Sequence, residues 1–178
     1  MSDSKKELWI SWLSLSTAII AVLAAITTLY MGKYSSRAIM KQGLESNQWA
    51  YYQAKSIKQH TYELQKKTLE LQFSADRSRM SGDSAAAFRE TIDAYEQEVK
   101  RYEGEKKEIK TKAEKIEKEK LIAQEMGGNF GYALIFVQIS IMLSSIASLT
   151  KKHYLWYLSL LCVVGWGFFF LDAIYLFY

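Results

Sequence analysis

The sequence predicts an all-α membrane protein with three transmembrane helices and a long antiparallel coiled-coil hairpin inserted between the first two. Three observations lead to this fold class. Residues 31–126 hold 19 of the 23 Lys and Arg and 16 of the 19 Asp and Glu, so charge is concentrated in one segment. The remaining residues form apolar runs long enough to cross a bilayer. The chain also lacks proline, which favours long uninterrupted helices.

The first predicted span covers residues 8–30, after a short N-terminal tail of residues 1–7. At about 1.5 Å per residue it reaches roughly 35 Å, enough to cross about 30 Å of hydrocarbon. Trp9 and Trp12 lie at its start and Tyr30 at its end, as is typical of aromatic rings at membrane interfaces. A cleaved signal peptide is the alternative, but the apolar stretch is longer than a typical signal core.

The second and third predicted spans, residues 130–150 and 154–178, are joined only by the Lys-Lys-His turn 151–153. They must therefore form a tight antiparallel pair. The N-terminus then shares one side of the membrane with this turn. Basic residues in short flanks favour the cytoplasm, so we expect a cytoplasmic N-terminus in a bacterial inner membrane and an exoplasmic, periplasmic stalk. Basic residues directly after the first span favour the opposite orientation, which stays open.

The charged segment is predicted to form two helices of nearly equal length, residues 31–77 and 84–126, joined by a turn at 78–83. Equal arms indicate an antiparallel hairpin in which each arm would reach roughly 65 to 70 Å. Eight basic and four acidic side chains give residues 31–77 a charge of +4, whereas ten and twelve give residues 83–126 a charge of −2. Gly82 suits the end of a helix, and Asp83 or Ser84 is the expected N-cap of the second arm.

Each arm carries residues spaced alternately four and three apart, the pattern of a coiled-coil seam. In the second arm the pattern continues over five heptads, and the only polar residues at its positions are lysines. Glu precedes Lys by four residues at 96 and 100, 103 and 107, 108 and 112, and 114 and 118, which adds local helix stability. The apolar seam positions that we expect to pack between the arms are Ile57, Leu64 and Leu71 in the first arm and Phe88, Ile92, Tyr95, Val99, Tyr102, Ile109 and Ile116 in the second.

Aromatic and small residues indicate further packing surfaces. Trp49, Tyr51 and Tyr52 lie about 27 Å beyond the first span, too far for the interfacial aromatic belt. We expect them to pack against neighbouring subunits; packing within the hairpin and binding of a ligand or partner protein are the alternatives. Small side chains also repeat along one face of the first span, which allows helices to approach closely. These residues are Ser14, Ala18, Ala21, Ala25, Thr28 and Gly32.

Few residues could carry chemistry. Asp172 and Gln138 are polar residues in apolar runs; we expect Asp172 to pair with Lys33 or Arg37 and Gln138 to hydrogen-bond a neighbouring helix, with ion transfer as the alternative. His60 and Glu63 share a spacing found in metal-binding bundles, but one copy indicates little. With one cysteine and no recognisable catalytic motif, we expect no enzyme, no cofactor and no metal site, and nothing in the charge pattern calls for nucleic acid.

Four stretches resemble a bacterial membrane-protein family catalogued only as a domain of unknown function. They are Gln48 to Lys58 followed by Tyr62 and Glu63, Arg101 to Lys110, Phe136 to Ile139 with Ala147 to Thr150, and Leu155 to Tyr157. The resemblance covers nearly the whole chain and implies a fold and a bacterial membrane, without an activity.

These observations favour a membrane scaffold or spacer that forms homo-oligomers and projects helical hairpins. Its partners would be the lipid bilayer, further copies of itself and, at the stalk or its tip, a possible second protein. An accessory subunit that docks on a transporter or envelope protein through the hairpin is the first alternative. A channel or metal-responsive transporter, built on Asp172, Gln138 and His60, is the second.

Overall fold

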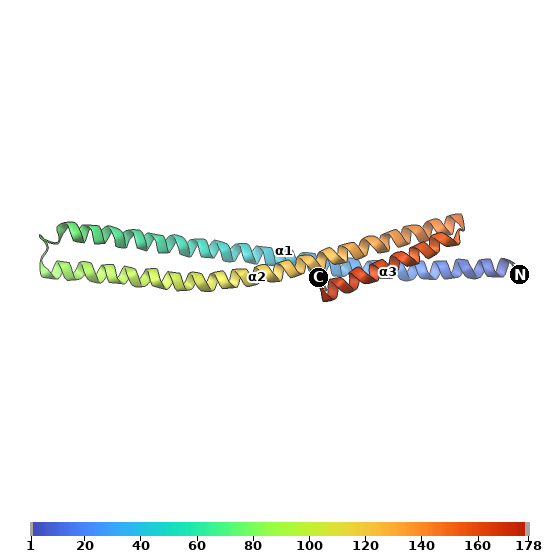
Figure 1. The fold of residues 1–178 in the computed structure, drawn as a ribbon, viewed down its shortest axis with the longest axis horizontal. Helices are drawn as coiled ribbons and strands as arrows, with labels where there is room; N and C mark the ends of the chain where they lie inside the picture. Colours follow the sequence, from blue (N-terminus) through green and yellow to red (C-terminus); the bar gives the residue numbers. More distant parts are fainter. Residues whose placement is uncertain (1, 177–178) are drawn as a thin grey trace. The chain divides into compact units, whose positions relative to one another are not determined.

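The computed structural model describes residues 2–176, with side chains from residue 8 onward, and over this range the chain is helical without a strand. Its helices are α1 (Ser2–Asp76), α2 (Gly82–Thr150) and α3 (His153–Tyr175) (Figure 1). Each contains a stretch long and apolar enough to cross a membrane. The prediction of an all-helical protein with three candidate spans is therefore confirmed.

The two turns are short, and both differ slightly from the predicted bounds. α1 ends at Asp76 and α2 begins at Gly82, so the first turn lies earlier than the expected 78–83. Ser81 caps α2 in place of Asp83 or Ser84, because its hydroxyl accepts a hydrogen bond from the Ser84 N–H at 3.3 Å. In the second turn Lys151 adopts a left-handed conformation, with φ of 56°, and α3 begins two residues later.

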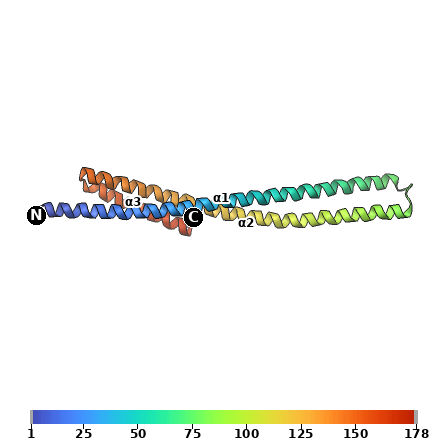
Figure 2. The ribbon, with the colours of Figure 1, turned by 180° about the vertical axis from the view of Figure 1, so that it is seen from behind.

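The described chain divides into two compact units. The first, here called the apolar unit, comprises Met1–Met40 and Glu119–Tyr178; the second, the polar unit, comprises Lys41–Lys118. Within the apolar unit the end of α2 lies beside α3, and within the polar unit α1 lies beside α2, as the opposite views of Figure 1 and Figure 2 both show. Each unit has a core of its own.

The core of the apolar unit is centred on Phe130, which is 1% exposed. Its ring stacks on Tyr30 and Tyr34, with centroid distances of 5.4 and 5.6 Å, and meets Phe170 edge to face at 5.3 Å. These contacts join all three helices. Aromatic pairs add about 0.5–1.5 kcal/mol beyond the area that they bury, so this cluster is a principal source of packing energy.

The core of the polar unit contains the predicted seam of the second arm, whose apolar members are all buried or half-buried. Tyr62 of α1 packs between Tyr95 and Tyr102 of α2, with centroid distances of 5.5 and 5.8 Å. Nearer the turn, Phe73 stacks on Phe88 at 6.2 Å. The contacting residue numbers rise along α1 as they fall along α2.

The first arm differs from the prediction. Ile57, Leu64 and Leu71 are 67%, 66% and 62% exposed and do not form the contact with α2. The contact is made by a second series offset by two residues, which includes Tyr62 and Phe73. Two residues correspond to about 200° around a helix, so the predicted seam lies on nearly the opposite face. The second series prevails because its rings bury more area and its lysines meet acceptors on α2.

Candidate functional site

The buried carboxylate of the apolar unit is held by an amide. Asn129 on α2 donates a hydrogen bond from Nδ2 to Oδ2 of Asp172 on α3 at 2.7 Å, and Asp172 is 6% exposed. A buried polar group of this kind is costly unless it is hydrogen-bonded, so the contact fixes α2 against α3. Lys33 lies over the rings of Tyr30 and Tyr34. The expected ion pair of Asp172 with Lys33 or Arg37 stays a prediction.

Serine hydroxyls join α2 to α3 at a second level. Ser140 Oγ donates to the carbonyl oxygen of Ser159 at 2.7 Å, and Ser144 Oγ donates to Ser159 Oγ at 3.0 Å. All three residues are almost fully buried. Small residues of this kind let two helices approach closely within a membrane, where dispersion contacts and hydrogen bonds drive association.

Two tryptophans join α3 to α1. Trp156 Nε1 donates to Ser16 Oγ at 3.0 Å, and Trp166 Nε1 donates to Thr27 Oγ1 at 2.9 Å. Sequence reasoning missed these contacts and the Asn129 contact as well. The available signal was the indole itself, because a buried Trp N–H usually finds an acceptor and an apolar run offers few of them.

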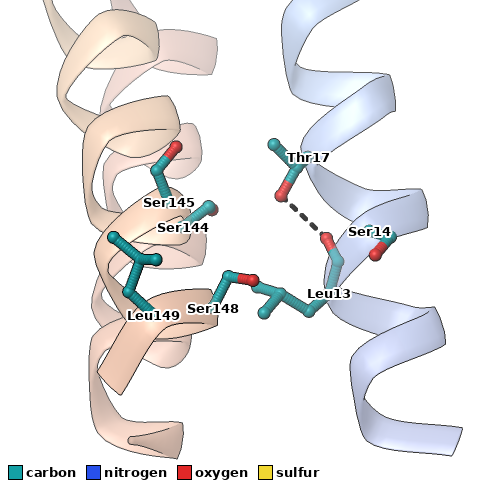
Figure 3. Close-up of a pocket in the computed structure, with 7 residues that line it drawn as sticks. All are labelled: Leu13, Ser14, Thr17, Ser144, Ser145, Ser148 and Leu149. Atoms are coloured by element: carbon teal, nitrogen blue, oxygen red, sulfur yellow. Dashed lines mark hydrogen bonds between the residues drawn. The ribbon is translucent and has the colours of Figure 1, made fainter. Parts of the chain in front are cut away.

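A groove of about 520 Å³ lies between α1 and α2 in the apolar unit (Figure 3). Its hydroxyls are largely occupied within their own helices: Thr17 Oγ1 donates to the Leu13 carbonyl at 2.7 Å, and Ser14 Oγ donates to the Ile10 carbonyl at 2.9 Å. The groove therefore presents mostly apolar surface, which suits a lipid chain or an apolar helix. Its lining residues are Leu13, Ser14, Thr17, Ser144, Ser145, Ser148 and Leu149.

The predicted small-residue face of the first span lies on the outside of the apolar unit. All six of its residues, Ser14, Ala18, Ala21, Ala25, Thr28 and Gly32, are exposed. A different face of α1, roughly 100–140° away around the helix, makes the contacts with α2 and α3, through residues such as Leu13, Ile20 and Thr27. Ser14 lines the groove with α2, and the other five residues of the small face stay exposed in the described part of the chain.

Gln138 is also exposed, although it lies in the middle of the apolar stretch of α2. Exposed apolar side chains surround it on the same face, including Ile135, Ile139 and Met142. In the part of the chain that the structure describes, its amide makes no hydrogen bond. The expectation that Gln138 bonds a neighbouring helix is therefore not met within the chain.

The Trp49 cluster divides between two faces of α1. Trp49 and Tyr52 meet edge to face at 5.7 Å, and Lys106 Nζ of α2 lies 5.2 Å from the centre of the Tyr52 ring. Packing within the hairpin, the alternative to packing against subunits, thus accounts for Tyr52. Tyr51 is 50% exposed, with Lys55 over its ring.

Lys106 also explains why a lysine stands in the predicted seam of the second arm. Its ammonium group donates to Ser56 Oγ at 3.2 Å and to Gln59 Oε1 at 3.1 Å, both on α1. With Tyr52 on another side, the charge is paired with acceptors and a ring face. The aliphatic stem can then pack in the seam while the charged end is satisfied.

Ion pairs between the helices of the polar unit follow the predicted charge difference. Lys55 Nζ lies 2.6 Å from Glu105 Oε2, and Lys66 Nζ lies 3.1 Å from Glu96 Oε2, with the lysine on α1 in both pairs. Hydrogen bonding to Lys55 lowers the pKa of Glu105, and hydrogen bonding to Glu105 raises the pKa of Lys55. These half-buried surface pairs contribute little energy each, but they define the register of α1 against α2.

Local pairs along the helices are partly as predicted. Glu96 pairs with Lys100 at 2.7 Å and Glu103 with Lys107 at 3.2 Å, as predicted. Glu114, whose predicted partner is Lys118 one turn after it, lies 3.8 Å from Lys110, one turn before it.

The possible metal ligands do not converge. His60 Nδ1 lies 2.9 Å from Glu63 Oε2 on the same helix, and this contact lowers the pKa of Glu63. Among the described residues, no group of three His, Cys, Asp or Glu side chains is placed to hold a metal ion.

A second exposed stripe runs along α1 in the polar unit. It contains the predicted seam residues Ile57, Leu64 and Leu71, together with further residues that complete a spacing of four and three, and every member is exposed. We call it the α1 stripe, and its members are Ala50, Ala54, Ile57, Thr61, Leu64, Thr68, Leu71 and Ala75. Its heptad spacing is typical of a helix that packs against another helix.

These features define an all-helical protein with three helices able to cross a membrane and a charged helical pair between the first two. Residues 9–176 match the protein family described as Domain of unknown function (DUF4337). The chain belongs to this family, as the resemblance implied. No curated protein and no solved structure matches it.

Proposed function

We propose that this protein is a non-enzymatic scaffold of a bacterial inner membrane, which self-associates through its apolar unit and holds an antiparallel coiled-coil hairpin outside the bilayer. The observation that carries this proposal is the unused outer surface of the apolar unit. There the small-residue face of α1 is exposed, and Gln138 makes no hydrogen bond with any residue that the structure describes.

Membrane physics makes that surface a site for other helices. Lipid offers no hydrophobic drive for association, so small residues and polar side chains supply the attraction instead. An amide in hydrocarbon gains about 0.6–2 kcal/mol from a partner on another helix. A second copy brings both a small face and a second Gln138, so it satisfies both requirements.

The contacts of the polar unit support the role of a spacer. The rings of Tyr62 and Phe73 pack on α2, and the Lys55–Glu105 and Lys66–Glu96 pairs lie across the same two helices. A helical pair held in this register would keep its tip, and whatever binds there, at a fixed distance from the membrane. We propose that this tip faces the periplasm, because Lys151 and Lys152 flank the spans on the other side.

The alternative is an accessory subunit that docks on a transporter or an envelope protein. The α1 stripe supports it, since an exposed heptad pattern can also receive a helix of a different protein.

The native mass of the complex, extracted in mild detergent from its own membrane, tests the proposal. We expect an integer multiple, greater than one, of 20.5 kDa. Ala21→Ile should lower this mass because it adds bulk to the small face, whereas Val22→Ile, at an exposed neighbouring position off that face, should not. A monomer would overturn the proposal, and a second polypeptide in fixed ratio would favour the accessory subunit.

A further inference from the structure

We infer that the α1 stripe is the seam of a parallel, in-register coiled coil between copies of this chain, an inference that rests on the proposed self-association. The stripe is not simply exposed apolar surface. Ile57, Leu64 and Leu71 lie seven residues apart and are all more than 60% exposed. Large aliphatic residues at this interval are the d positions of a coiled coil.

The positions between them are suited to close contact. Thr61 and Thr68 occupy the a positions, and each hydroxyl donates to a carbonyl of its own helix, at Ile57 and Leu64, with both distances 2.9 Å. The hydroxyls are thus satisfied within α1. The methyl groups of these threonines can then face a partner without leaving a polar group unpaired.

The membrane selects the direction of a second copy. In every copy α1 begins with a candidate span and continues into the polar unit. Copies inserted in one bilayer with the same orientation therefore present this part of α1 in the same direction. Two such stripes meet parallel and in register, so that each residue faces its own counterpart.

The flanking charges permit this arrangement. In a parallel pair each g position faces the e position five residues later in the partner. This places Gln53 opposite Lys58, His60 opposite Gln65 and Lys67 opposite Gln72. No two lysines oppose each other, so the self-pairing carries no like-charge penalty. The stripe covers roughly three and a half heptads, in the range in which a coiled-coil pattern is significant.

Site-specific cross-linking in native membranes tests the inference. Cys162, the only cysteine of the chain, is first replaced by Ser. Single cysteines then replace Ile57, Leu64 or Leu71, and mild oxidation should give a disulfide-linked dimer from each of the three. Glu70→Cys is the control, since it is exposed on the same helix but off the stripe and should not cross-link.

A second variant addresses cross-links formed by chance collision. Adding Leu71→Glu to the Ile57→Cys protein places like charges opposite each other in the seam, and the cross-linked dimer should be lost. Addition of Glu90→Gln, an exposed change on α2, should leave it intact.

The remaining outcomes separate this inference from the scaffold proposal. If the native complex is a multimer but none of the three cysteines cross-links, the stripe does not join copies and only the scaffold survives. Cross-linking at a single position would overturn the parallel register. Cross-links to a different polypeptide would assign the stripe to another protein. A monomeric native mass would overturn both proposals.

Discussion

Lys66 on α1 reaches Glu96 on α2, with its ammonium nitrogen 3.1 Å from Oε2 of the carboxylate. The other carboxylate oxygen of Glu96 lies 2.7 Å from Lys100 on the same helix. Together the hydrogen bonds from Lys100 and Lys66 lower the pKa of Glu96 to about 2. The Glu96 carboxylate thus takes part in one ion pair within α2 and in another between α2 and α1.

The pairing of the polar unit should weaken in acid. A carboxylate whose pKa is lowered in the folded state stabilises that state above its ordinary pKa, and the contribution is lost as the pH falls. For Glu96 this window extends from about pH 4.5 down to about pH 2. Glu63 and Glu105, whose pKa values are also lowered, act in the same direction.

Thermal unfolding followed by circular dichroism from pH 6 to pH 3 measures this effect. We expect the midpoint to fall with pH, and to fall less in Glu96→Gln than in the parent. Glu90→Gln is the control and should retain the pH dependence of the parent. If the parent and Glu96→Gln respond identically, Glu96 does not contribute to acid stability.

Loss of the Asn129 amide should destabilise the apolar unit. Asn129→Leu removes the donor to the buried Asp172 carboxylate, and we expect a loss of about 1–3 kcal/mol in unfolding free energy. Unfolding in detergent measures it. Gly128→Ala is the matched control, because a Cβ there meets nothing within 4 Å. A variant as stable as the parent would show that Asp172 does not depend on this amide.

Gly165 should resist substitution by alanine. A Cβ at this position would lie 2.7 Å from Cδ1 of Phe136, closer than real contacts allow, so either the ring or the helix must move. Phe136 is stacked on Phe169 at 5.4 Å, and movement of its ring disturbs that pair. We therefore expect Gly165→Ala to lower the unfolding temperature in detergent. Gly167→Ala enters open space and should be tolerated; equal effects of the two changes would contradict the packing of α2 on α3.

A double-mutant cycle tests the contact between Trp166 and Thr27, whose polar atoms are 2.9 Å apart. Hydrogen bonds between membrane helices are worth about 0.6 kcal/mol on average, with a maximum near 1.7. We expect a coupling energy in this range between Trp166→Phe and Thr27→Val. The pair Trp166→Phe and Thr28→Val provides the control, since Thr28 is exposed and its hydroxyl donates to the Ala24 carbonyl. Zero coupling in the first cycle would show that this hydrogen bond does not help to hold α3 against α1.

The orientation in the membrane can be measured at the turn before α2. Arg79→Cys in a Cys162→Ser background should react with a membrane-impermeant maleimide on intact cells, because we place this turn in the periplasm. The unsubstituted background should stay unlabelled. Labelling that requires cell lysis would place the turn in the cytoplasm and reverse the orientation.

The sequence by itself determined the elements whose signals are local. The partition of charge predicted three apolar stretches and a charged insertion, because a bilayer accepts only long apolar segments. The seam of the second arm followed from its heptads, since α2 carries one apolar stripe, and Tyr102, Ile109 and Ala113 on that stripe are buried. Where a helix has a single face to bury, spacing identifies it.

Only the tertiary structure decided which face of α1 contacts α2. The first arm carries two series of positions spaced by four and three, and spacing alone does not choose between them. The choice depends on which residues α2 presents. Tyr62 packs against Tyr95 and Tyr102, and Lys66 pairs with Glu96, whereas Leu64 can form neither a ring contact nor an ion pair. For the same reason, the acceptors of Trp166 and Trp156 became visible only once three helices were packed together. Which groups pair depends on the distances between helices, and the sequence of a single helix does not specify those distances.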